Sequence, residues 1–170
     1  MSIRNAAKDG RTIKHLLEGA EREALADGEE LWGAEHLVLA ALALADGSAR
    51  RAFERAGLDP DDYRAAIGRQ HDAALASVGV EPCHAPARTP IQASAKRFGP
   101  EGTANGRSLF QAAGALGRIG KEPFSGAHVI LALTEMEHGT AARALVAMGV
   151  DRAALARAAR EELEGAAAVR

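Results

Sequence analysis

Two stretches of the sequence carry residue types that bind metal ions in other proteins. Glu135 and His138 have the E-x-x-H spacing that di-iron helical bundles place on one helix face. Such a site needs a second pair of this kind, but the one other stretch of similar sequence holds Ala43 and Asp46 at those positions. The single cysteine, Cys83, lacks the neighbouring C-x-x-C that a zinc site needs. We therefore expect neither a metal site nor a cofactor.

Two further stretches suggest catalysis only at first sight. Residues 114–122 read GALGRIGKE, but a phosphate-binding loop needs Ser or Thr after its lysine and a preceding strand. Here Glu122 follows the lysine, and no strand is expected before it. Residues 124–128, FSGAH, lack the spacing of a nucleophile elbow. We expect no catalytic residues and no enzyme activity.

Two histidines, His36 and His128, occupy matching positions in a repeated phrase. Residues 36–59 align without a gap with residues 128–151, and the glycine, histidine and aspartate identities carry more weight than the alanine ones. These identities are His36/His128, Gly47/Gly139, Gly57/Gly149 and Asp59/Asp151. The alignment predicts an internal duplication. The two histidines could be ligands, but the sequence favours a structural role in which they hold helix-end carbonyls in the core.

Each copy is predicted to form a helix, turn, helix, turn and helix, preceded by one amphipathic helix. Residues 36–45 are apolar nearly all round, which is typical of a buried helix. We expect Gly47 and Gly139 to end the two buried helices, and Asp59 and Asp151 to cap the last helix of each copy.

The preceding amphipathic helices are predicted at residues 12–28 and, weakened by two glycines, at residues 108–120. Trp32 and Phe124 lie at matching places just before the buried helices, and we expect them to close the entry to each.

The predicted fold is all-α, with two four-helix repeats related by a pseudo-twofold axis in a single domain, residues 1–170. Repeat one covers about residues 10–76, a linker about 77–105 and repeat two about 106–166. The linker holds four of the six prolines, which do not continue helices, with one helical turn expected at residues 94–98.

Composition agrees with a helical protein and excludes some partners. Of the 170 residues, 47% are hydrophobic and 4% aromatic, and the abundant alanine favours helices over strands. The formal net charge of −2 gives no basic stripe for nucleic acid. No apolar run approaches the roughly 20 residues that span a bilayer, and the N-terminus lacks a signal peptide's apolar core. We predict a cytoplasmic protein that contacts neither nucleic acid nor membrane.

The two copies resemble a known family. Residues 33–59, GAEHLVLAALALADGSARRAFERAGLD, and residues 125–151, SGAHVILALTEMEHGTAARALVAMGVD, resemble the Clp N-terminal (Clp R) repeat domain. That module precedes the ATPase rings of Hsp100 unfoldases such as ClpC and ClpA. The resemblance covers roughly residues 10–163 and implies a compact all-α pseudo-dimer of two four-helix repeats. No nucleotide-binding segment follows within the chain, so we expect a free-standing module.

The resemblance also implies a candidate ligand site at Glu35. In ClpC-type relatives this glutamate receives the guanidinium of an arginine-phosphorylated client, and a threonine at the head of the preceding helix holds the phosphate. Here the threonine position falls on Gly10, with Thr12 two residues later. In the second repeat it falls on about Gln92, and the glutamate is Ala127. The alternative is that Glu35 stabilises its own helix N-terminus through the macrodipole.

The resemblance further places a helix cap at Ala34, which cannot cap, and at Gly126, which caps weakly. Grooves between the two halves are expected to accept helices or extended segments. The most exposed apolar candidates for such a surface are Ile3, Ile91 and Phe98.

The function that these features imply is non-catalytic binding of peptides, adaptors or degradation clients, which would modulate Clp-dependent proteolysis. An alternative is a sequestering protein, or decoy, for cyclic peptide antibiotics or other small ligands that target the ClpC N-terminal domain. A third is a helical scaffold for a partner encoded nearby.

Overall fold

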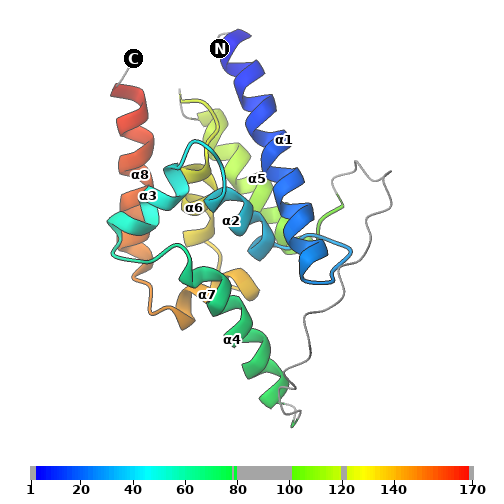
Figure 1. Ribbon diagram of the computed structural model, residues 1–170. Helices are drawn as coiled ribbons and strands as arrows, with labels where there is room; N and C mark the ends of the chain where they lie inside the picture. Colours follow the sequence, from blue (N-terminus) through cyan, green and yellow to red (C-terminus); the bar gives the residue numbers. More distant parts are fainter. Residues whose placement is uncertain (1–2, 78, 80–100, 120–121, 169–170) are drawn as a thin grey trace.

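The computed structural model describes the backbone of residues 3–77, 79, 101–119 and 122–168, which form eight helices (Figure 1). These are α1 (Ile3–Ala26), α2 (Ala34–Leu42), α3 (Ser48–Arg55), α4 (Asp62–Ser77), α5 (Ala104–Ile119), α6 (Gly126–Thr134), α7 (Thr140–Ala147) and α8 (Arg152–Ala168). Within these ranges the β-type pairing is a single bridge between Trp32 and Gly102. The predicted all-α fold of two four-helix repeats is confirmed.

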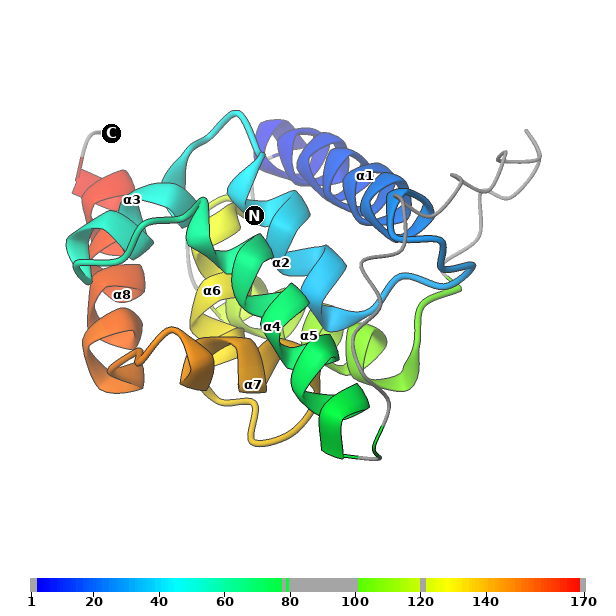
Figure 2. The ribbon, with the colours of Figure 1, turned by 60° about the horizontal axis from the view of Figure 1, so that its bottom comes forward.

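The two short apolar helices, α2 and α6, pack against each other at the centre of the molecule (Figures 1 and 2). Every residue of α6 is buried, and so is every residue of α2 except Glu35. Because both faces of these helices are covered by other helices, they are apolar all round, as the sequence predicts.

The predicted ends of the central helices are wrong by a few residues. The helix α2 ends at Leu42 rather than Ala45, because the amides of Ala43 and Leu44 already turn back to the last carbonyls of the helix. Gly47 and Gly139 do not end α2 and α6. They have positive φ angles of 65° and 102° and precede α3 and α7 as N-caps.

The glycines that follow α3 and α7 end those helices in the same way in both repeats. Gly57 and Gly149 have φ angles of 75° and 68°, where a glycine avoids the Cβ penalty. The amide of Leu58 then donates to the Phe53 carbonyl at 3.0 Å, and that of Val150 donates to the Leu145 carbonyl at 3.1 Å. This 6→1 bond is the mark of a Schellman ending, and it appears twice.

The outer helices begin at positions that differ from the expected ones. The helix α1 starts at Ile3, nine residues before the predicted start at Thr12. Asp151 caps α8 as predicted, accepting from the amides of Ala153 at 2.9 Å and Ala154 at 3.2 Å. Asp59 instead accepts from Asp61 at 2.9 Å within a turn, so α4 begins later than predicted, at Asp62.

The two repeats are interleaved. Helix α3 of the first repeat packs on α8 of the second, and α4 of the first packs on α7 of the second. The segments before the central helices also cross over. The amide of Thr103 donates to the Trp32 carbonyl at 2.9 Å, and the amide of Phe124 donates to Asp9 Oδ1 at 2.9 Å. Trp32 and Phe124 are both buried, and both rings pack against α5, Trp32 beside Gly106 and Phe124 beside Gly117.

The pseudo-symmetry is approximate. Helix α5 packs on both central helices, while α1 packs chiefly on α2, and α6 runs along α8 more extensively than α2 does along α4 (Figure 1). The predicted turn at residues 94–98 lies outside the described residues. Among the described residues, no helix is both long and apolar enough to cross a membrane.

Candidate functional site

The two matched histidines hold the starts of the central helices. The amide of Gly33 donates to His36 Nδ1 at 2.9 Å, and the amide of Ser125 donates to His128 Nδ1 at 3.1 Å. Each imidazole is 1% exposed. A side chain at the third helical position reaches back to the N-cap amide, as Glu or Gln does in a capping box. The histidines are structural, but they satisfy amides rather than the carbonyls we expected.

Outside that shared bond, the two histidines have different neighbours. His36 Nε2 lies 3.3 Å from Asp27 Oδ2, so a neutral His36 donates there while Nδ1 accepts. His128 stacks on Phe124 with ring centroids 5.5 Å apart and planes 12° apart, and its Nδ1 lies 3.0 Å from Ser125 Oγ. Burial lowers the pKa of His128, because the charged form loses its hydration.

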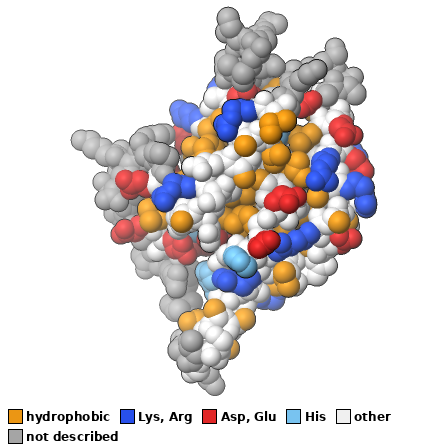
Figure 3. All heavy atoms as spheres, turned by 180° about the vertical axis from the view of Figure 1, so that it is seen from behind, with side chains coloured by type: hydrophobic (Ala, Val, Ile, Leu, Met, Phe, Trp, Pro, Cys, Tyr) orange, Lys and Arg blue, Asp and Glu red, His pale blue; other side chains and the backbone are white. Residues whose placement is uncertain are grey.

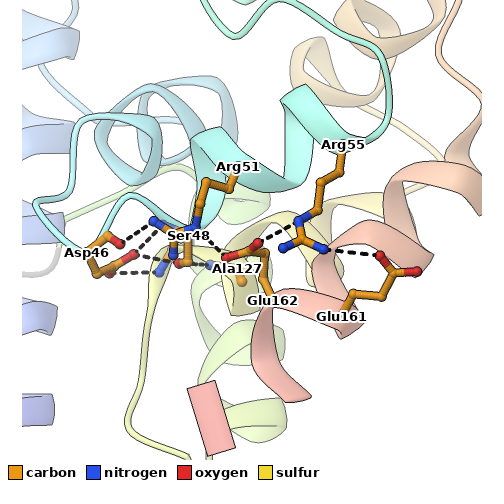
Figure 4. A network of polar contacts seen from close by, with 8 residues as sticks. Asp46, Ser48, Arg51, Arg55, Ala127, Glu161 and Glu162 are labelled. Atoms are coloured by element: carbon orange, nitrogen blue, oxygen red, sulfur yellow. Dashed lines mark hydrogen bonds and ion pairs between the residues drawn. The ribbon is translucent and has the colours of Figure 1, made fainter. Parts of the chain in front are cut away.

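The start of α6 is capped by the other repeat. The amide of Gly126 donates to Asp46 Oδ2 at 3.2 Å, and the amide of Ala127 donates to Ser48 Oγ at 2.9 Å (Figure 4). Asp46 is held in place because its Oδ1 accepts from the Ser48 amide at 2.8 Å. Two amides that a helix start leaves unpaired are thereby satisfied from a distant part of the chain.

The caps correct the expectation about Ala34 and Gly126. Both are first helical residues, and the N-caps are Gly33 and Ser125. At the start of α2, no side chain in the described part of the chain accepts a hydrogen bond from the Ala34 or Glu35 amide. The positions equivalent to Asp46 and Ser48 are occupied by His138 and Thr140, and neither bonds to α2.

Glu35 lies at the second position of α2 with its side chain 15% exposed. Its carboxylate folds back over the helix start, since a Cβ atom built on Gly33 would overlap it. The negative charge therefore sits at the positive end of the helix, as the macrodipole favours. Burial, and then the charge of Glu35, raise the pKa of Tyr63. The hydroxyl of Tyr63 is buried and has no hydrogen-bond partner among the described residues.

The residues expected to hold a phosphate do not form a helix start in the first repeat. Gly10 and Thr12 lie inside α1, because that helix begins at Ile3, and Thr12 is half-buried. The side chain of Ile3 lies outside the described residues, as do Ile91, Gln92 and Phe98. The start of α5 is marked by Thr103, whose Oγ1 accepts from the Gly106 amide at 3.2 Å. A threonine just before a helical stretch is a capping signal that the sequence itself offers.

The ligand-type groups of Glu29, Glu35 and His36 lie within 4.8 Å of one another. Both nitrogens of His36 are already engaged, one by the Gly33 amide and the other by Asp27. A metal ion would have to displace one of these partners. Glu135 and His138 do not share a helix face, because α6 ends at Thr134.

A buried carboxylate ties α8 to α3. The side chain of Glu162 is 4% exposed and lies 2.7 Å from Arg51 Nε and 2.8 Å from Arg55 Nε (Figure 4). Arg55 also reaches Glu161, with 3.5 Å between Nη1 and the carboxylate. Because α3 and α8 come from different repeats, this network joins the two halves at the surface.

A family model for the Clp repeat (R) N-terminal domain matches residues 11–97, just over half of the chain. The match covers most of α1 and all of α2, α3 and α4. A search of curated proteins finds no match.

Proposed function

Because the chain belongs to the Clp repeat (R) N-terminal domain family, we propose that it is a non-catalytic module that binds proteins or peptides and modulates Clp-dependent proteolysis. The observation that carries this proposal is the family match over the first repeat, extended by the second repeat with equivalent helices. The domain family is related to the N-terminal domains of Clp unfoldases, which precede the ATPase rings.

The polar side chains of the candidate site are engaged by other groups of the fold, which supports a binding role rather than catalysis. Asp46, Ser48, His36, His128 and Glu162 each have a partner inside the fold. On the face opposite to the view of Figure 1, apolar side chains gather in the centre, with acidic and basic side chains around them (Figure 3). Apolar side chains gathered on a surface and bordered by polar ones are typical of a face that contacts other proteins.

The proposed mechanism is competition by mass action. A module that holds a client or an adaptor lowers the free concentration of that ligand, so the corresponding domain of an unfoldase binds less of it. The expected effect is dose-dependent and does not require ATP on this chain.

The test uses a reconstituted Clp unfoldase and protease degrading a fluorescent client, with and without its adaptor. Adding the full chain is expected to slow degradation in proportion to its concentration, and the chain should capture the adaptor or the client in a direct binding assay. Unchanged degradation together with no binding to unfoldase, adaptor or client would overturn the proposal.

Calorimetric titration with a cyclic peptide ligand of Clp N-terminal domains separates this function from the decoy alternative. The decoy function would be favoured if the chain binds the cyclic peptide tightly and does not change degradation when no peptide is present. Absence of peptide binding would leave the protein-binding role alone.

A further inference from the structure

The interleaved repeats create two equivalent surfaces, one formed by α3 and α8 and the other by α7 and α4. On the α3/α8 side, the charged residues at the surface pair with one another. Arg51 and Arg55 are about half exposed and hold the buried carboxylate of Glu162 between them (Figure 4). Glu161 pairs with Arg55 at the rim. Arg51 and Arg55 thus already have carboxylate partners from α8.

The dyad-related surface carries different residues at these positions. An arginine, Arg143, stands at the position of Arg51, but Ala147 stands at that of Arg55. The positions of the two glutamates of α8 are occupied by Arg69 and Gln70. Val146, which takes the place of Glu54, is 68% exposed. We call Arg69, Arg143, Val146 and Ala147 the α4/α7 surface; α4 and α7 cross at the front of Figure 2.

This surface has unmatched charge as well as exposed apolar area. Arg69 and Arg143 are exposed, and within the described ranges neither forms an ion pair. A guanidinium offers a planar set of donors that fits a carboxylate, so each arginine favours an acidic side chain. Val146 and Ala147 lie on the α7 side and favour an aliphatic contact. A basic, apolar surface of this kind complements an acidic, aliphatic segment.

We propose that the α4/α7 surface docks a partner-protein segment with two adjacent carboxylates followed by an aliphatic residue. Helix α8 shows the same charge pairing inside this chain, where Glu161 and Glu162 pair with the arginines of α3 at positions 51 and 55. The inference rests on the proposed binding function and names one of its surfaces and the class of ligand. It differs from the candidate site at Glu35, which lies at the start of α2.

The probe is a synthetic alanine-based helical peptide that carries Glu-Glu-Leu, titrated into the full isotope-labelled chain and followed by amide chemical shifts. Saturable shifts are expected in α4 and α7. A matched peptide with Gln-Gln-Leu should bind about tenfold more weakly or not at all, because it has no charge to pair with the arginines. Binding should also weaken as salt is raised.

The variant Arg143→Glu is expected to weaken Glu-Glu-Leu binding about tenfold or more, since it replaces an attraction by a repulsion. Arg160→Glu, an exposed arginine of α8, is the matched control and should leave binding unchanged. Thermal melting of both variants confirms that they fold. Absent shifts, shifts centred elsewhere, equal binding of the Gln peptide, or an equal effect of the control would each overturn the inference.

The degradation assay separates this inference from the proposed function. If the wild-type chain slows degradation and Arg143→Glu slows it equally, the surface is wrong and the binding function stands. If the wild-type chain has no effect and no partner, the proposed function itself fails.

Discussion

The amide of Ala127 donates to the hydroxyl of Ser48 at 2.9 Å, and this bond joins the second repeat's central helix to the first repeat. The two residues are 79 positions apart in the chain. Asp46 adds a second cap to the same helix start. The first repeat therefore supplies a local element of the second, and the α6 cap depends on how the two repeats are docked.

Replacing Ser48 by alanine removes that acceptor and leaves a buried amide without its partner. We expect the free energy of unfolding to fall by about 1 kcal/mol, the typical cost of a lost helix cap. Urea unfolding followed by circular dichroism measures it. The control is Thr140→Ala at the equivalent position, whose side chain bonds to no described residue, and it should change stability by less than about 0.5 kcal/mol. Equal losses would show that the cap contributes nothing.

Stability is expected to depend on pH through His128. Burial lowers the pKa of this imidazole, so the folded state favours its neutral form. The stabilisation is present above the unfolded pKa of about 6.5 and is lost as pH falls below it, because the unfolded chain then binds the proton more readily. Protonation of Nδ1 also removes the acceptor for the Ser125 amide. The urea midpoint should therefore be lower at pH 5.5 than at pH 7.5.

The control for the pH effect is His128→Gln, which keeps an acceptor at the third helical position but does not titrate. Its urea midpoint should vary less between the two pH values than that of the wild type. A pH dependence of the same size in this variant would assign the effect to other groups.

Much of the fold follows from local patterns in the sequence. The pairing of residues 36–59 with residues 128–151 places both buried helices, and Gly57, Gly149 and Asp151 have the structural roles that their types predict. These features depend on residues that are neighbours in the sequence, so they can be predicted from one sequence alone. The alanine that follows Leu42 gives no signal for the end of α2, because alanine favours a helix wherever it stands.

The contacts between the repeats could not be predicted in the same way. Asp46 and Gly126 are 80 positions apart, and Arg51 and Glu162 are 111 apart. Such pairs arise only when the two halves dock, and no local pattern names the partner. The sequence predicts α1 only from Thr12, two residues after Gly10, whereas the helix begins at Ile3, because an isolated glycine is tolerated inside a long helix.

A substitution of Glu35 distinguishes a structural role of this residue from a role in ligand binding. Its carboxylate lies over its own helix start, so Glu35→Gln should lower the free energy of unfolding by about 0.3–1 kcal/mol through the macrodipole. We expect no calorimetric binding of an arginine-phosphorylated peptide to the wild type, because Gly10 lies inside α1 and the second repeat has Ala127. Micromolar binding that Glu35→Gln abolishes without changing stability would reverse this assignment.

Leu39 and Leu131 occupy equivalent positions on the two central helices, and each is 8% exposed. Replacing either by alanine removes side-chain contacts on a helix covered by its neighbours and leaves a cavity. We expect each substitution to cost about 2–5 kcal/mol, measured by urea unfolding with an unchanged slope. The two losses should be similar, because α2 and α6 contact each other across the pseudo-twofold axis. Losses below about 1 kcal/mol in either helix would mean that its centre is not packed as the structure shows.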